Sequence, residues 1–446
     1  MGISLDLSLL TEILGQNLRR SPAGEVSGEV RHISTDTREI GKGDIFVALV
    51  GERFDGHDYV TKAVASGAIA VITSHEIDID VPQWIVDDTL RAYQDIGYWW
   101  RKQVDIPIIA ITGSVGKTST KELIAGVLAT QGNVLKTEAN FNNEIGVPKT
   151  LLNLTSDHDF AVIEMAMRGK GEIARLAEIA VPTIGIITNV GTAHIGRLGS
   201  RQAIAEAKCE LLEFMPDTGV AILNGDDERL MTTAQTVWPG HTLSYGLEKG
   251  ELHGEYDAGQ VTVATQTFPV PLAGKHNALN YLAALGVMQV LNLGWEQLEQ
   301  GVSLSMPKGR SQQIQLPNDI LLFDETYNAG VESMLAALDL LKSAKGDRRI
   351  AVLGTMKELG EFAAELHSKV GSRVEALHLD QLFVLADEPV AEAIATAAPS
   401  IPSQCFTDHT SLISHLKQEL KGGDRVLFKA SNSVGLSRVV QALQQG

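Results

Sequence analysis

The pattern of hydrophobic and polar positions begins with a small unit of alternating strands and helices. GDIFVALVG (43–51) and AIAVITS (68–74) are short apolar segments typical of buried strands, and YVTKAVASG between them has the spacing of a helix. The pattern resets near Asp105-Ile106-Pro107. We therefore expect a small α/β domain over residues 1–103.

A second stretch, residues 104–314, repeats this alternation on a larger scale. Helix-like segments separate four segments that are apolar enough to form buried strands: IPIIAIT, FAVIEMA (160–166), TIGIITNV (183–190) and GVAILN (219–224). Strands that alternate with helices predict a parallel sheet covered by helices on both faces. Residues 242–272 instead alternate polar and apolar positions around glycines, which predicts β-hairpins late in this domain.

The third stretch, residues 315–446, predicts another doubly wound, Rossmann-like sheet. Its expected strands are ILLFDET, RRIAVLG, QLFVLA and RVLFKA, and GVSLSMPKGRSQQ before them is typical of a linker. The predicted fold class is therefore α/β with three domains. A central parallel-sheet domain lies between a small α/β domain and a carboxyl-terminal Rossmann-like domain.

Composition limits the partners of the chain. Of its 446 residues, 44% are hydrophobic and 21% charged, and the formal net charge of −18 disfavours passive binding to nucleic acid or to an anionic membrane. Only two cysteines occur, which does not indicate a disulfide framework. No apolar run approaches the roughly 20 residues of a membrane span, and the start lacks the order of a secretion signal. We expect a cytoplasmic protein with no nucleic-acid partner and no membrane insertion.

The strongest chemical signal is a glycine-containing loop between an expected strand and an expected helix. Its two glycines let backbone N–H groups turn toward a phosphate chain, its lysine supplies a cation, and its threonine hydroxyl suits Mg²⁺. The common pattern has another glycine where this chain has Ile111, but the strand–helix context disfavours a chance match. The predicted ATP-binding residues are Gly113, Ser114, Val115, Gly116, Lys117, Thr118 and Ser119.

Two further polar residues fall where parallel strands end, which is where such sheets bind ligands. Glu164 lies inside FAVIEMA, where an unpaired carboxylate would cost several kcal/mol, and His194 follows TIGIITNV. Together with Thr118 they are suited to hold Mg²⁺, although each alone is equally consistent with a structural hydrogen-bonded group. Lys208 lies in the helical run IAEAKCELLEF, and its spacing alone predicts a solvated lysine.

The motifs taken together resemble one enzyme family. TGSVGKTST, TEANFNNEIGVP, EMAMRGKGEI, TNVGTAHIGRLGS, AKCELL, GKHNALN and FDETYNA occur in the order seen in the Mur ligases of bacterial cell-wall synthesis, and STDTR, GERFDGHDY and VLGTMKELG are also similar. EANFNNEIG and EMAMRGKGEI look most like the member that adds D-alanyl-D-alanine to UDP-N-acetylmuramoyl-tripeptide. The resemblance implies an ATP-dependent amide-bond ligase of peptidoglycan synthesis, which we expect to be a monomer.

The resemblance also implies roles for individual residues. Lys117, Glu164, His194 and Lys208 would be catalytic; Thr118 and Glu164 would bind one Mg²⁺, and His194 and Lys208 a second. Lys208 would carry CO₂ as a carbamate, because an anionic ligand suits Mg²⁺ and an ammonium does not. Further nucleotide-site residues would be Asn142 or Asn143, His276, Asn277, Asn280, Arg310, Asp324, Tyr327 and Asn328. The UDP end of the substrate would meet Ser34, Thr37, Arg38, Asp55 and Gly56.

Several positions depart from the family pattern and keep alternatives open. Gly196 stands where an acidic residue is common, Gly330 replaces an Asn, Thr355 replaces an Asp, and Lys429-Ala430-Ser431-Asn432 replaces Lys-Gly-Ser-Arg. The last two lie in the domain expected to bind the incoming amine. A related ligase that adds a single amino acid, or one of the folylpolyglutamate type, is therefore the alternative. A P-loop switch or transport ATPase is the alternative from another class, although the chain has no Asn-Lys-x-Asp guanine motif.

Overall fold

The amino-terminal domain is built on a five-stranded sheet in the order β2-β7-β6-β5-β4. The computed structural model describes residues 5–24 and 26–445. The sheet contains β2 (Leu18–Arg20), β4 (Ile33–Ser34), β5 (Asp44–Val47), β6 (Ala68–Thr73) and β7 (Gln83–Val86). Every residue of β5 is buried, as its apolar run predicts. β1 (Leu5–Asp6) and β3 (Glu29–Val30) form a separate antiparallel pair, and the helices are α1 (Leu10–Leu14) and α2 (Val60–Ala65).

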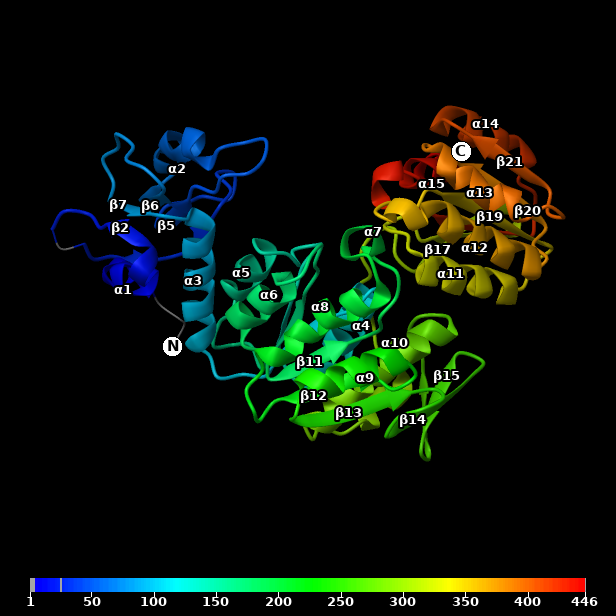
Figure 1. The fold of residues 1–446 in the computed structure, drawn as a ribbon, viewed down its shortest axis with the longest axis horizontal. Helices are drawn as coiled ribbons and strands as arrows, with labels where there is room; N and C mark the ends of the chain where they lie inside the picture. The colour runs from blue at the N-terminus through cyan, green and yellow to red at the C-terminus, as the bar shows by residue number, and fades with distance from the viewer. Residues whose placement is uncertain (1–4, 25, 446) are drawn as a thin grey trace.

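Helix α3 (Thr89–Lys102) connects this domain to the central one (Figure 1). It begins where the Asp88 carboxylate accepts hydrogen bonds from the amides of Leu90 and Arg91, which satisfies free N–H groups of its first turn. Near its end, the buried Arg101 guanidinium donates to the carbonyl oxygens of Val104 (2.6 Å) and Ala180 (3.0 Å). The connection between the two domains is therefore tied to the central domain.

The central domain has a nine-stranded sheet in the order β16-β15-β14-β13-β12-β11-β8-β10-β9. Its parallel strands include β8 (Ile108–Thr112), β9 (Val134–Lys136), β10 (Phe160–Glu164), β11 (Ile184–Ile187), β12 (Val220–Asn224) and β13 (His241–Gly246). The helices are α4 (Lys117–Leu128), α5 (Gly146–Leu151), α6 (Glu172–Ala180), α7 (Ile195–Leu198), α8 (Arg201–Glu213), α9 (Glu228–Val237) and α10 (Lys275–Val290).

The two faces of this sheet are covered by different helices, as predicted. Ile109 and Ile111 of β8 pack in the apolar cluster that contains Leu123 of α4. Ile108 and Ala110 belong to a second cluster, because successive side chains of a strand point to opposite faces. β8 is therefore an interior strand, which lies between β10 and β11 and leads into the glycine loop.

The prediction of hairpins over residues 242–272 is partly wrong. β14 (Leu252–Asp257), β15 (Gln260–Val263) and β16 (Gln266–Pro269) do pair antiparallel. β13, in contrast, pairs parallel with β12. Its alternation arises because Leu243 and Tyr245 are buried in the α10 cluster while Thr242 and Ser244 are half-exposed.

The carboxyl-terminal domain has a six-stranded sheet in the order β17-β18-β22-β19-β20-β21. Its strands are β17 (Gln312–Leu316), β18 (Ile320–Asp324), β19 (Arg348–Gly354), β20 (Gln381–Leu385), β21 (Ser403–Phe406) and β22 (Asp424–Lys429). Its helices are α11 (Val331–Ser343), α12 (Ala363–Ala376), α13 (Ala393–Thr396), α14 (His409–Glu419) and α15 (Ser437–Gln444). β17 is antiparallel and the other strands are parallel. The predicted boundary at 314/315 falls within β17.

The three-domain α/β fold class is confirmed, with the domains arranged in chain order in Figure 1. Within residues 5–24 and 26–445, no helix has the length and apolar character needed to cross a membrane.

Candidate active site

The glycine loop joins β8 to α4, and its two glycines are required by close neighbours. Gly113 has φ +152°, and a Cβ there would overlap Thr188 Oγ1 at the end of β11. Gly116 has φ +85°, and a Cβ there would lie 2.9 Å from Asn280 Oδ1 on α10. Any larger residue would be strained in both backbone and packing. The loop is thus held between β11 and α10.

Hydrogen bonds hold the first half of the loop and leave the helix end available. The amides of Ser114 and Val115 donate to Asn189 O and Asn189 Oδ1, each at 3.1 Å. The following amides, from Lys117, Thr118 and Ser119, lie in the first turn of α4, where no helical carbonyl can accept them. This end of α4 is therefore the anion-binding part of the loop.

Lys117 folds back over the loop, where Nζ donates to Gly113 O at 2.9 Å. Burial lowers the pKa of Lys117, an effect that the Glu164 carboxylate opposes. The ammonium is thus held close to the turn in which a phosphate would lie. Lys121, one helical turn later, is buried and donates to Thr137 O at 2.7 Å. Lys121 is not among the predicted site residues, although its spacing of four residues from Lys117 on a helix could have indicated it.

Glu164 is the most closely paired of the predicted residues. It ends β10 with 1% of its surface exposed. Thr118 Oγ1 donates to Glu164 Oε2 at 2.9 Å, and Asn142 Nδ2 donates to Glu164 Oε1 at 2.8 Å. These bonds offset the cost of burying the carboxylate. Asn143, the other candidate at this point, instead accepts from Gly146 N at 2.9 Å, at the start of α5.

Lys208 is buried in α8, with 2% of its surface exposed. The alternative of a solvated lysine is therefore wrong. Among the described residues, its Nζ has no hydrogen bond or ion pair. Burial, reinforced by the charge of Lys117, brings the pKa of Lys208 well below its usual value. Burial in this place thus disfavours the ammonium form of Lys208.

His194 lies in the loop after β11 with a left-handed backbone (φ +65°) and precedes α7. Its Nδ1 is 2.7 Å from Glu358 Oε2 of the carboxyl-terminal domain. Burial and the charge of Lys117 lower the pKa of His194, and the Glu358 carboxylate opposes them. The charge of Lys117 thus acts on both His194 and Lys208, while Glu164 acts on Lys117. Lys117 is thus the residue whose charge connects Glu164, His194 and Lys208.

The donor set fits Mg²⁺ in part. The described residues contain no cluster of three or more His, Cys, Asp or Glu side chains that could hold a metal. The Thr118 hydroxyl and the Glu164 carboxylate, joined at 2.9 Å, are hard oxygen donors of the kind that Mg²⁺ prefers. As an amine Lys208 is a poor ligand for Mg²⁺, which prefers oxygen donors, whereas a derivative with an anionic oxygen would suit it.

The predicted adenine-side residues begin α10. Asn277 Nδ2 donates to Ala273 O at 2.8 Å, and Asn280 Nδ2 donates to Asn277 Oδ1 at 3.3 Å. Since Asn280 also faces Gly116, this end of α10 lies directly beside the phosphate loop. Burial lowers the pKa of His276 in the same turn.

The carboxyl-terminal residues fall into two groups. The Arg310 guanidinium lies 4.0 Å from the centre of the Tyr327 ring, and its charge lowers the pKa of Lys117. Asp324 and Asn328 hold the chain around Tyr327 instead. Asp324 Oδ1 accepts from Thr326 N (3.1 Å) and Thr326 Oγ1 (2.6 Å), and Asn328 Oδ1 accepts from Ala329 N (2.9 Å).

The residues predicted to meet UDP lie in two loops of the amino-terminal domain and are not brought to the phosphate loop. Ser34 Oγ accepts from Asp36 N at 3.0 Å, and the exposed Arg38 pairs with Asp36, which lies one residue before Thr37. Asp55 Oδ1 accepts from His57 N at 2.9 Å. A Cβ at Gly56 would lie 2.6 Å from Leu49 O. Asp55 thus caps the turn that follows it, and Gly56 packs closely against Leu49.

One ion pair links this region to the central domain. Lys149 Nζ on α5 lies 2.8 Å from the Glu39 carboxylate, which follows Ser34, Thr37 and Arg38 in the same loop. The chain segment that carries Ser34, Thr37 and Arg38 is thus anchored to α5 of the central domain.

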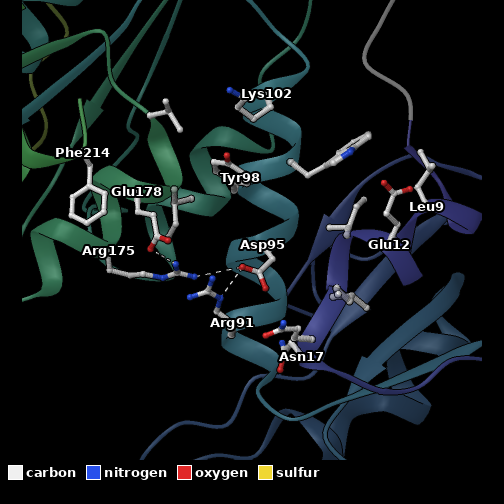
Figure 2. Close-up of a pocket in the computed structure, with 17 residues that line it drawn as sticks. Leu9, Glu12, Asn17, Arg91, Asp95, Tyr98, Lys102, Arg175, Glu178 and Phe214 are labelled. Atoms are coloured by element: carbon white, nitrogen blue, oxygen red, sulfur yellow. Dashed lines mark hydrogen bonds and ion pairs between the residues drawn. The ribbon is translucent and has the colours of Figure 1, made fainter. Parts of the chain in front are cut away.

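A cavity of about 930 Å³ lies away from all these residues, at the joint between the amino-terminal and central domains. It is lined by α1, α3, α6 and Phe214 (Figure 2). Arg91 and Arg175 approach Asp95 at 2.8 Å and 3.6 Å, as Figure 2 shows. None of the predicted site residues lines this cavity.

Family models match all three domains. Residues 29–96 match the Mur ligase family catalytic domain, residues 111–288 the Mur ligase middle domain, and residues 309–432 the Mur ligase glutamate ligase domain. Among solved structures, the chain is similar to MurF from Acinetobacter baumannii (TM-score 0.90, 30% identity, 100% of this chain and 99% of that one). It is also similar to MurF from Thermotoga maritima in complex with ADP (TM-score 0.85, 30% identity, 93% and 97%).

Two relatives have the name UDP-N-acetylmuramoyl-tripeptide--D-alanyl-D-alanine ligase. The protein from a Synechocystis strain is 56% identical over 417 residues, which are 93% of this chain and 92% of that protein. The protein from Escherichia coli K12 is 37% identical over an aligned length of 460 residues, gaps included. The alignment covers 99% of this chain and 99% of that protein. With these matches along its length, the chain belongs to the Mur ligase family.

Proposed function

We propose that this protein uses ATP to join D-alanyl-D-alanine to UDP-N-acetylmuramoyl-tripeptide, a step in the synthesis of peptidoglycan precursors. The observation that carries the proposal is the glycine loop itself, over which Lys117 folds and whose Thr118 donates to the buried Glu164 carboxylate. Its substrates are those in the names of relatives that match almost the whole chain.

The chemistry follows from the reacting groups. A carboxylate resists attack by an amine, so its oxygen first attacks the γ-phosphorus of ATP, and ADP leaves. The amine of the dipeptide then attacks the carbonyl carbon of the acyl phosphate. The tetrahedral intermediate loses phosphate and a proton to give the amide. Lys117 is placed to neutralise charge on the transferring phosphoryl group.

We propose that Thr118 and Glu164 hold one Mg²⁺, and that His194 and carbamylated Lys208 hold a second. When bound, the metal ions supply positive charge for the phosphate oxygens. The bond between Thr118 and Glu164 supports the first site. For the second, the neutral amine of Lys208 is the form that reacts with CO₂. A new N–C bond forms and one proton is released. The resulting carbamate gives Lys208 anionic oxygen donors, whereas its amine has no partner among the described residues.

The departures in the carboxyl-terminal domain leave an acidic group at the expected amine site. Thr355 Oγ1 donates to Asp387, and Lys357 Nζ lies 2.5 Å from the same carboxylate. Asp387 thus supplies a carboxylate beside the position where the family pattern has an Asp. Gly330 has open space around it, so its replacement of Asn removes a side chain without changing the packing.

The proposal is tested by offering different amines under identical conditions. Purified protein with ATP, Mg²⁺ and UDP-N-acetylmuramoyl-tripeptide receives D-alanyl-D-alanine, single amino acids or glutamate, and products are identified by mass. We expect the dipeptide to be joined fastest. Faster product formation with a single amino acid would reject this acceptor and favour the related ligase.

We also propose a cytoplasmic location. Cys209 and Cys405 are both free thiols, as is usual in a reducing compartment, and the reaction consumes ATP.

A further inference from the structure

Two carboxylates of the carboxyl-terminal domain contact the loop that carries His194. We call residues 190–197 the histidine loop. The first contact comes from Glu332, in the first turn of α11. Its Oε1 accepts from Thr192 N at 2.9 Å, and its Oε2 accepts from Thr192 Oγ1 at 3.1 Å. One carboxylate therefore holds both the backbone and the side chain of Thr192.

The second contact comes from Glu358, in the segment between β19 and α12. Its Oε2 lies 2.7 Å from His194 Nδ1, and its backbone oxygen accepts from Gly196 N at 3.3 Å. α7, which His194 precedes, lies next to the carboxyl-terminal domain in Figure 1. The His194 ring is thus held through Nδ1, and Nε2 has no hydrogen bond among the described residues.

Two glycines of the histidine loop lie where the other domain packs. A Cβ at Gly191 would lie 2.6 Å from the carboxyl carbon of Glu332, and a Cβ at Gly196 would lie 2.5 Å from Gly360 N. Neither glycine has a positive φ, so the backbone conformation does not require glycine at either position. At Gly196 the backbone of the carboxyl-terminal domain occupies the space, so glycine is needed there; at Gly191 a larger residue would instead push the end of the Glu332 side chain away from Thr192. The composition of the loop is therefore matched to this contact.

We infer that Glu332 and Glu358 are positioning residues that seat the carboxyl-terminal domain on the histidine loop and orient His194. The inference rests on the proposed function, in which His194 serves the ATP site. A carboxylate on one ring nitrogen fixes the orientation of an imidazole and leaves the other nitrogen for a ligand. Since Glu358 belongs to the carboxyl-terminal domain, His194 is oriented only when that domain is seated. The same domain is expected to bind the incoming amine. The family pattern commonly has an acidic residue at position 196, and this chain has glycine. The contact explains the difference, since a side chain at position 196 would displace Gly360.

Hydrogen exchange of the full-length protein tests the contact without any substrate. Glu332→Ala removes the acceptor of the Thr192 amide. We expect exchange in residues 189–199 to become about tenfold faster, as for the loss of a hydrogen bond worth about 1.4 kcal/mol. Glu361→Ala, which removes an exposed carboxylate in the same segment as Glu358, is the matched control and should leave exchange unchanged. Exchange within about twofold of wild type in Glu332→Ala would overturn the inference.

Kinetics then separate positioning from mere structural support. Glu358→Ala should lower kcat by about a hundredfold, because misplacing a reacting group by a small distance has effects of this size. The KM for the UDP substrate should stay within about twofold, because that end of the substrate is bound by another domain. Glu358→Gln should recover most of the activity, since its amide oxygen can accept from Nδ1–H. An unchanged kcat in Glu358→Ala, or equal losses in Glu358→Ala and Glu358→Gln, would overturn the role of Glu358.

The two tests also distinguish this inference from the proposed function. Wild-type protein that makes no product would reject the proposed function, and with it the role of His194 in ligation. The exchange experiment would still decide whether the two carboxylates seat the domain.

Discussion

At the scale of single residues, the site holds two buried polar groups with opposite surroundings. One is a carboxylate with hydrogen bonds to both oxygens, and the other is an amine for which the described residues provide none. Glu164 accepts bonds from Thr118 and Asn142, whereas Lys208 has no partner among the described residues. Sequence reasoning could predict Glu164, because a carboxylate inside an apolar strand needs partners. It could not predict the burial of Lys208 from spacing, because α8 packs on both α6 and α9 and its lysine side is covered. Only the family resemblance indicated it.

Substitution of Lys208 tests the carbamate directly. Lys208→Ala should lower turnover by about a hundredfold or more, because an anionic donor to the second metal is lost. Formate or acetate should restore part of the activity by occupying the space of the carbamate. Lys170→Ala, which removes an exposed lysine paired with Glu206, is the control and should keep wild-type turnover. Full activity of Lys208→Ala would contradict the carbamate.

At the scale of helices and strands, burial determined what the sequence could predict. β5, β8 and β20 are continuous apolar runs, and each was expected as a strand. β17 and β21 were missed because they are edge strands with exposed polar residues, so they leave no apolar run to detect. Their pairing is set by the neighbouring strand rather than by their own sequence.

His367 on α12 ties this helix to the segment after β19 and makes stability depend on pH. Its Nδ1 donates to Ala363 O at 2.7 Å, and its Nε2 accepts from Met356 N at 2.9 Å, so the folded protein needs the neutral ring. Burial lowers the pKa of His367 below its usual 6.5. As the pH falls through 6.5 the unfolded chain gains a proton that the folded one does not, so the stability contributed by the neutral ring is lost in acid.

The free energy of unfolding of His367→Gln, compared with that of wild type, should depend on pH. At about pH 8 the variant should be less stable by about 1–3 kcal/mol, because the Met356 amide loses its acceptor. The difference should shrink by up to about 1.4 kcal/mol per pH unit below the pKa of an unfolded histidine. Urea unfolding at about pH 8 and about pH 5.5 measures both values, with the exposed His378→Gln as control. A difference that stays constant between the two pH values would contradict the neutral, doubly bonded ring.

At the scale of the whole molecule, the sequence predicted three sheets but not how the domains meet. The contacts between domains combine apolar packing, such as that of α3 on α5 and α6, with polar pairs such as Lys149 with Glu39 and Glu358 with His194. Such pairs leave no periodic pattern, so neither Glu332 nor Glu358 could be singled out from its surroundings in the sequence. The predicted UDP residues and the phosphate loop lie in different domains, which the long substrate would bridge. Closure of the domains is expected to accompany turnover.

The central claim is that amide-bond formation is coupled to ATP, and the stoichiometry of the complete reaction tests it most directly. Purified protein is given UDP-N-acetylmuramoyl-tripeptide, D-alanyl-D-alanine, ATP and Mg²⁺, and ADP and the joined product are quantified together. We expect about one ADP for each product, no product when any one substrate is left out, and neither ADP nor product with Lys117→Ala. ADP release that continues at the full rate without the dipeptide, or product that forms without ATP, would contradict the account.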